Sequence, residues 1–378
     1  MVISGTNAGV FCHDFGTLML NEVTASIVSV EMRLMRDGVT LDTIVETYTP
    51  DANGIIQVNG LGELAKSYFP EQGMVLKAAD AANIQRCPAT ITMQITVSDA
   101  EGVRLGTATQ TFYYANCRTN IADPYKYMGF LTRHRRYKVR PDQSVNLSCL
   151  GLGQLFGLGI SYLRNGVEQW IELAYALPDN GYIITRSLRV ADVLDLLPKQ
   201  NSGPQLTIDC IRYYIAYTKH DGQVVDAVQY DVDRRHFPAI TQFAYYNCFG
   251  CPETLYFTGS DERSTEIDAT IAKINGQHRK IKTNMATYHG INTGYINETL
   301  RDCVEDLVHS SRVYLVDNDI LRDMITITEV DFSENKPRTE PINIKMTYRV
   351  ANEVQRTCDR DPSVDFRIFD HTFGDEFE

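Results

Sequence analysis

The stretch IVSVEMRLMRDGVTLDTIVETYTPDANGIIQVNGLGELAKSYF, residues 27–69, decides the fold. Apolar residues alternate on both sides of Asp37-Gly38, and a second turn signal, PDANG, follows at residues 50–54. An Asp-Gly pair between alternating runs predicts a β-hairpin, because type I′ turns need positive φ at both central residues. The stretch closes with a short amphipathic segment, Leu61–Phe69. We therefore expect a hairpin followed by a short helix.

Residues 160–197, ISYLRNGVEQWIELAYALPDNGYIITRSLRVADVLDLL, repeat this pattern. Asn165-Gly166 takes the place of Asp37-Gly38, and a further hairpin is expected after each copy, at 89–114 and 205–232. The sequence thus predicts two copies of a hairpin–helix–hairpin unit. We expect a looser third copy with a hairpin tip at Asn275-Gly276, a helix over 295–310 and strands over 311–316 and 324–348.

Length and composition favour several β-rich domains. The chain has 378 residues, 43% of them apolar, with 21 Tyr and 15 Phe, and Val, Ile and Thr dominate the periodic runs. The predicted fold class is mainly β, with repeated β-sandwich-like modules, each with a short helix, and irregular connecting segments. The expected organisation is a first β module over 1–114, a connector over 115–158, a second β module over 159–239, a third β/α module over 240–350 and an acidic tail over 351–378.

Charge and hydropathy argue against several classes of partner. The net charge of −12 disfavours nucleic-acid binding, which needs a basic face. No run of 18 apolar residues predicts a membrane span, and the first residues lack the features of a secretory signal. Nine cysteines without regular spacing favour reduced thiols over a disulfide framework.

Two charged segments are candidate interaction sites. The basic residues Arg133, Arg135, Arg136, Lys138 and Arg140 are predicted either to meet an acidic surface of an adjacent subunit or to form a solvated connector. The acidic tail carries Phe366, Phe369 and Phe373, and we expect it either to dock onto a neighbour or to cover the protein's own core.

No motif predicts catalysis, a cofactor or a metal. Cys248-Phe249-Gly250-Cys251 is a single CxxC, whereas a structural zinc site needs four ligands, so we expect two cysteines in a turn. The glycine-rich segment at 151–157 departs from the dinucleotide-binding spacing and precedes a hairpin, not a helix. Aromatic residues at 112–114, 213–214 and 245–246, with Trp170, form a candidate sugar-binding platform, although the same residues suit a β-sheet core.

Three segments resemble structural tail proteins of tailed bacteriophages and prophages of gut Bacteroides-type bacteria. They are AYYNCFGCPETLYFTG at 244–259, INTGYINETLRDCVEDLVHSSRVYLVDN at 291–318 and EPINIKMTYRVANE at 340–353. Similar distal-tail-like proteins of the tail tip or baseplate end with a "TYRYAN"-like strand, from which Val350 departs.

The resemblance implies ring or hub assembly at the tail end and supplies no catalytic residues. We therefore expect a non-enzymatic virion component, made in the cytoplasm of the bacterial host. Its expected partners are copies of itself in a homo-oligomer and other virion tail proteins, with no nucleic acid and no membrane. The alternative is a carbohydrate- or surface-binding β-sandwich protein of a bacterium.

Overall fold

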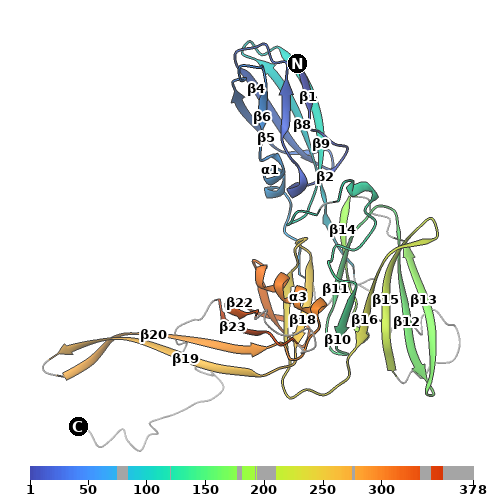
Figure 1. Ribbon diagram of the computed structural model, residues 1–378, viewed down its shortest axis with the longest axis vertical. Helices are drawn as coiled ribbons and strands as arrows, with labels where there is room; N and C mark the ends of the chain where they lie inside the picture. The colour runs from blue at the N-terminus through green and yellow to red at the C-terminus, as the bar shows by residue number, and fades with distance from the viewer. Residues whose placement is uncertain are drawn as a thin grey trace, which may run out of the picture.

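The fold is mainly β, as the sequence predicts. The computed structural model describes residues 1–74, 84–119, 121–176, 181–191, 193, 210–274, 277–332 and 342–351. These residues form two β-sandwiches and a third body built on a seven-stranded sheet, from which a long hairpin projects (Figure 1). The bodies are named here the N-terminal sandwich, the central sandwich and the seven-stranded sheet.

The N-terminal sandwich packs a five-stranded sheet against a three-stranded one. The five-stranded order is β2-β9-β8-β4-β5 and the three-stranded order is β1-β3-β6. Alternation along β4 points Val30, Met32 and Leu34 into the core between the sheets. Its elements are β1 Val2–Ser4, β2 Val10–Phe11, η1 Cys12–Asp14, β3 Leu18–Asn21, β4 Val28–Arg36, β5 Val39–Tyr48, β6 Ile56–Val58, α1 Leu61–Ser67, β8 Thr90–Asp99 and β9 Arg104–Tyr113.

The central sandwich has the same plan. Its five-stranded sheet has the order β10-β16-β15-β12-β13, and its three-stranded sheet has the order β11-β14-β7. Helical residues 190–191 and 193 follow β14, where the sequence predicts the second short helix. Its elements are η2 Pro124–Lys126, β7 Ile84–Pro88, β10 Arg136–Val139, β11 Asn146–Leu150, β12 Leu155–Arg164, β13 Val167–Ala176, β14 Tyr182–Ser187, β15 Cys210–His220 and β16 Gln223–Val232.

The strand pairing within the two five-stranded sheets follows the predicted repeat. In each five-stranded sheet, the first strand of the first hairpin pairs with the first strand of the second hairpin, and an earlier strand adds in parallel to the far edge. Both predicted turns have positive φ: 49° and 79° at Asp37-Gly38, and 50° and 74° at Asn165-Gly166. The two five-stranded sheets therefore share a strand order as well as a local pattern. The three-stranded sheets differ, because β6 is an edge strand whereas its counterpart β14 is central.

The third block keeps the element order but not the topology. Its single sheet has the order β18-β17-β21-β22-β23-β20-β19, and β20 pairs with β23 rather than with the hairpin that follows the helix. The expected third copy is thus wrong at the level of the sheet, although hairpin, helix and hairpin occur in the predicted order. The expected tip at 275–276 lies outside the described residues. The elements are β17 Thr241–Tyr246, β18 Pro252–Phe257, β19 Asp261–Ile274, β20 Gln277–Asn292, α3 Glu298–His309, β21 Val313–Asp317, β22 Ile320–Asp331 and β23 Lys345–Val350.

The segment 115–158 differs from the expected irregular connector. It contains β10, β11 and the first residues of β12, all of which belong to the central sandwich. In β10, Tyr137 and Val139 point inward while Arg136 and Lys138 point outward. The basic cluster is therefore part of an ordinary alternating strand. β7 also departs from the expected boundary between the first and second modules. It precedes β8 of the N-terminal sandwich in the chain, but it pairs with β14 of the central sandwich.

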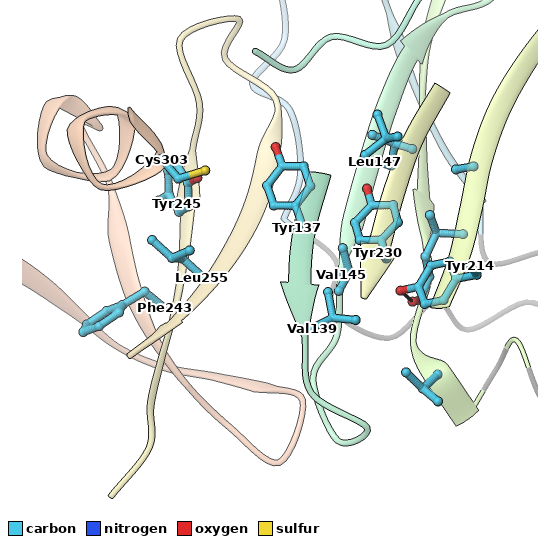
Figure 2. Close-up of a cluster of buried hydrophobic side chains, with 14 of the residues drawn as sticks. Tyr137, Val139, Val145, Leu147, Tyr214, Tyr230, Phe243, Tyr245, Leu255 and Cys303 are labelled. Carbon is cyan, nitrogen blue, oxygen red and sulfur yellow. Dashed lines mark hydrogen bonds between the residues drawn. The ribbon is translucent and has the colours of Figure 1, made fainter. Parts of the chain in front are cut away.

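The central sandwich and the seven-stranded sheet share one hydrophobic core. Tyr137 lies between the two bodies in Figure 2, with Tyr230 and Tyr214 on one side and Tyr245 on the other. The ring of Tyr230 stacks on Tyr137 at 5.4 Å and on Tyr214 at 4.9 Å between centroids. This continuous packing fixes the two bodies against each other.

Candidate interaction surfaces

Each arginine of the predicted basic cluster pairs with an acidic residue of its own chain. Arg133 lies 3.1 Å from Asp306 of α3, and Arg140 lies 3.2 Å from Asp142. The remaining pairs are Arg135 with Asp226 at 2.9 Å and Arg136 with Asp231 at 2.6 Å, and Lys138 is the register partner of Asp231. The cluster therefore neutralises acids of β16 and α3, and these intramolecular partners compete with any acidic partner from outside.

The Arg133–Asp306 pair joins the central sandwich to α3. Asp306 is only 6% exposed, and one of its carboxylate oxygens has no hydrogen-bond partner among the described residues. Desolvation lowers the pKa of Arg133, whereas the negative charge of Asp306 and its hydrogen bond raise it, and the resulting pKa is raised. A buried carboxylate held by one half-exposed guanidinium makes Arg133 the residue of the cluster on which the packing depends most.

A buried polar network lies beside this pair, at the joint between the two bodies. The Glu253 carboxylate accepts hydrogen bonds from the hydroxyls of Tyr137 at 3.2 Å and Tyr245 at 3.0 Å, and from the Asn247 amide at 2.6 Å. Asn247 also donates to the Leu131 carbonyl, which fixes its orientation. Burial raises the pKa of Glu253 despite these donors. The network satisfies a buried acid and sets the geometry of the joint.

The N-terminal sandwich meets the seven-stranded sheet at a second polar contact. The Arg312 guanidinium holds both oxygens of Glu71, with one N–O distance of 2.6 Å. The Tyr246 hydroxyl donates to the Gln72 carbonyl at 2.8 Å. These residues, with Tyr114, border a small cleft of about 140 Å³. The cleft is smaller than ordinary ligand pockets, so it fits a joint better than a substrate site.

The predicted CxxC occupies the β17–β18 turn. The Asn247 side chain accepts from the backbone N–H groups of Phe249 and Cys251, both at 3.0 Å, and so shapes this turn. Cys251 is buried, whereas the half-buried Cys248 thiol hydrogen-bonds Cys117, which raises the pKa of Cys248 and lowers that of Cys117. Within the described residues, no group of three or more His, Cys, Asp or Glu side chains is arranged to hold a metal ion.

Two long edge strands present apolar side chains to solvent. β5 forms the edge of its sheet, with exposed fractions of 64% at Val39 and 59% at Val45. Its acidic residues are Asp42 and Glu46, which accept hydrogen bonds from Tyr68 and Tyr48. The bond from Tyr68 lowers the pKa of Asp42, so this carboxylate is ionised at neutral pH. Among the described residues, no cation is paired with either acid.

The equivalent edge in the central sandwich is β13. Trp170 is 47% exposed there, and its ring lies beside Tyr213 with 6.2 Å between centroids. Gly159 of β12 provides the space, because a Cβ at that position would lie 2.2 Å from the indole. Of the predicted aromatic platform, only these two rings meet on the outer face, and Phe112, Tyr214 and Tyr245 are buried.

The β19–β20 hairpin is an arm that leaves the body of the molecule (Figure 1). β19 pairs only with β20, and β20 pairs with β23 only over His289–Asn292 among the described strands. Ile267 and Met285 face each other across the arm with exposed fractions of 59% and 47%. Toward the tip, the exposed residues include Lys273, Arg279 and Lys280.

Sequence reasoning missed β5 and the arm as surfaces. Their strands were expected, but exposure depends on which strands become edges, and only the assembled sheets decide that. The available signal was length, because β19 and β20 have 14 and 16 residues, well beyond a usual strand. Phe366, Phe369 and Phe373 of the acidic tail lie outside the described residues.

Neither of the two described helices is long and apolar enough to cross a bilayer. No protein-family model matches the chain, and no curated protein matches it.

Proposed function

We propose that this chain is a non-enzymatic structural component of a phage virion, at a tail tip, baseplate or connector ring, that assembles through protein–protein contacts. The observation that carries the proposal is the free edge of β5, ten residues long with Val39, Leu41 and Val45 exposed. A long apolar edge is hazardous on a monomer, because it pairs with other chains, but it suits an assembly in which a neighbour covers it.

The joints between the bodies support the same role. A shared core links the central sandwich to the seven-stranded sheet, and the Arg312–Glu71 pair ties the N-terminal sandwich to that sheet. A chain of rigidly connected β-bodies presents its edges at fixed relative positions, which a closed ring requires. The sequence resemblance to distal-tail-like proteins points to the particle. Copies of the chain and other tail proteins are then its partners, and it assembles in the bacterial host cytoplasm.

The first test is the oligomeric state of the purified chain, measured by native mass spectrometry and light scattering. We expect a discrete homo-oligomer, or one that forms when candidate tail proteins are added. A Val39→Lys, Val45→Lys double variant should weaken it, because two charges would be buried at the covered edge. Val2→Lys, at an exposed valine of the short strand β1, is the matched control. A strict monomer under all these conditions would end the proposal.

The second test addresses the particle. Antibodies against the chain should label the tail end of phage particles released from a host that carries the gene, as seen by immuno-electron microscopy. If the chain forms an oligomer but the antibodies label no particle, the chain self-assembles without being part of the virion, and the virion role is refuted.

A carbohydrate-binding role is the second candidate, and the exposed Trp170–Tyr213 pair favours it. Trp170 is the only tryptophan in the chain, so intrinsic fluorescence reports directly on this face. A ligand that stacks on the indole should change the emission, and Tyr213→Ala should weaken that change. Unchanged emission across a panel of bacterial surface oligosaccharides would reject this candidate.

A further inference from the structure

The β19–β20 arm lacks the partners that stabilise a two-stranded ribbon. Sixteen residues form β20 and four of them pair with β23, so twelve extend beyond the sheet, about 40 Å at the rise of a strand. An isolated two-stranded hairpin is marginally stable in water, and this one exposes Ile267, Ile271 and Met285. Both its length and its apolar residues indicate that a third strand covers it in the assembled state.

The free edge of β20 and the free edge of β5 have opposite charge. On the arm, Arg279 and Lys280 are exposed, and no acidic residue occurs in β20. On β5, the charged residues are Asp42 and Glu46, and no basic residue occurs. In a chain with a net charge of −12, a basic strand edge that meets an acidic one is a specific match.

The β13 edge is a poorer match for the arm. Its acids already have cationic partners, since Glu168 lies 2.6 Å from Arg212 and Glu172 lies 3.5 Å from Lys219. The acids of β5 have no cationic partner among the residues that the structure describes, and the strand is regular from Asp42 to Tyr48, beyond the bulge near its turn. A regular edge whose charge is opposite to that of the arm is the better template for an added strand.

We propose that the arm of one chain adds its β20 edge to the β5 edge of a second copy. The two edges lie far apart on one molecule, since the arm and the N-terminal sandwich extend in different directions (Figure 1). The contact is therefore between chains and joins unlike surfaces, so it closes into a ring or continues as a filament. This inference rests on the proposed self-assembly and specifies the two strands through which the chains meet.

Charge reversal and rescue test the pairing. Arg279→Glu with Lys280→Glu should weaken the oligomer at least tenfold, and Asp42→Lys with Glu46→Lys should do the same. The quadruple variant should restore assembly, because the attraction is re-formed with exchanged signs. Raising the salt concentration should weaken the wild-type oligomer. Thermal melting checks that each variant is folded.

The matched control reverses Glu168 and Glu172 on β13, and it should leave assembly intact. If that control abolishes assembly while the β5 variant does not, β13 is the acceptor and the proposal is wrong. If the wild type assembles and no reversal affects it, the pairing fails while the proposed function stands. A wild type that never assembles is a failure of the proposed function instead.

A second measurement does not depend on charge. A photo-crosslinking amino acid at Met285, an exposed residue of β20 outside its pairing with β23, should give an inter-chain product whose partner peptide lies within residues 39–48, identified by mass spectrometry of mixed isotopically labelled chains. Crosslinks confined to one chain would overturn the proposal. Nucleic acid is the other ligand for a basic tip, so a DNA-binding assay is included. DNA binding that is lost with the arm reversal, with no effect of the β5 reversal on assembly, would assign the arm to that ligand.

Discussion

Glu253 illustrates how a single residue sets the character of a joint. Its carboxyl is buried between Tyr137 of the central sandwich and Tyr245 of the seven-stranded sheet, where burial raises its pKa. A raised carboxyl pKa means that the folded protein binds the proton more tightly than the unfolded chain does. The contribution of Glu253 to stability is then complete below its unfolded pKa and declines as the pH rises through the folded value.

We expect Glu253→Gln to remove this pH dependence. Below the unfolded carboxyl pKa the variant should be less stable than the wild type by about 1–3 kcal/mol, because the new amide nitrogen faces donors that the fixed Asn247 and the tyrosines present. The deficit should shrink as the pH rises through the raised pKa of Glu253, above which only the wild type bears the cost of ionisation. Urea unfolding at several pH values measures both curves, and parallel curves would contradict this account.

Arg133 and Arg136 carry the same charge but differ in what they support. Asp306, the partner of Arg133, is buried, whereas Asp231, the partner of Arg136, is part-exposed. Arg133→Met should therefore cost about 1–3 kcal/mol, because it leaves an uncompensated buried carboxylate. Arg136→Met, the matched control, should change stability little. Equal losses in thermal unfolding would show that burial of the partner does not matter here.

The sequence predicts this basic cluster as a local feature but not its role. Arg133 and Asp306 are 173 positions apart, and no local pattern connects them. Pairing of this kind follows from the tertiary fold, so the sequence left a subunit contact and a solvated connector as open alternatives.

At the scale of elements, local turns were predictable and sheet order was not. Asp37-Gly38 and Asn165-Gly166 carry their own conformational requirement, and both hairpins form where expected. By contrast, the pairing of β20 with β23 depends on contacts more than 50 residues apart, which periodicity does not encode. The third block therefore matched the repeat in element order alone.

Gly38 provides the test at this scale. It has a φ of 79° and open space around its Cα, so a Cβ meets no neighbour and the cost is purely one of backbone conformation. Gly38→Val should destabilise the N-terminal sandwich by about 1 kcal/mol or more. Gly16→Val is the control, because Gly16 has equally open surroundings without a positive φ. An unchanged melting temperature for Gly38→Val would argue against the type I′ turn.

The whole molecule has three bodies but only two large hydrophobic cores among the described residues. The N-terminal sandwich has its own core, the central sandwich and the seven-stranded sheet share a second one, and a smaller buried cluster that includes Phe11, Leu150 and Phe249 joins all three bodies. We expect two calorimetric transitions, since a shared core melts as a unit. Leu34→Ala should lower the melting temperature of the N-terminal transition alone, and Leu147→Ala that of the other transition alone. Each substitution should reduce the free energy of unfolding of its unit by about 2–5 kcal/mol. Three transitions, or a shift of both by either variant, would contradict this division.

The position of β7 has a consequence for how such a gene can change. β7 is encoded between α1 and β8 of the N-terminal sandwich, yet it completes the three-stranded sheet of the central sandwich by pairing with β14. A recombination event with its breakpoint after residue 114 would bring in a new downstream partner without the matching β7. The edge of β14 would then lack a strand selected to fit it. The two sandwiches look like tandem copies, but no breakpoint between them spares both: one after residue 114 separates β7 from β14, and one just upstream of residue 84 separates β8 and β9 from β4 and β2.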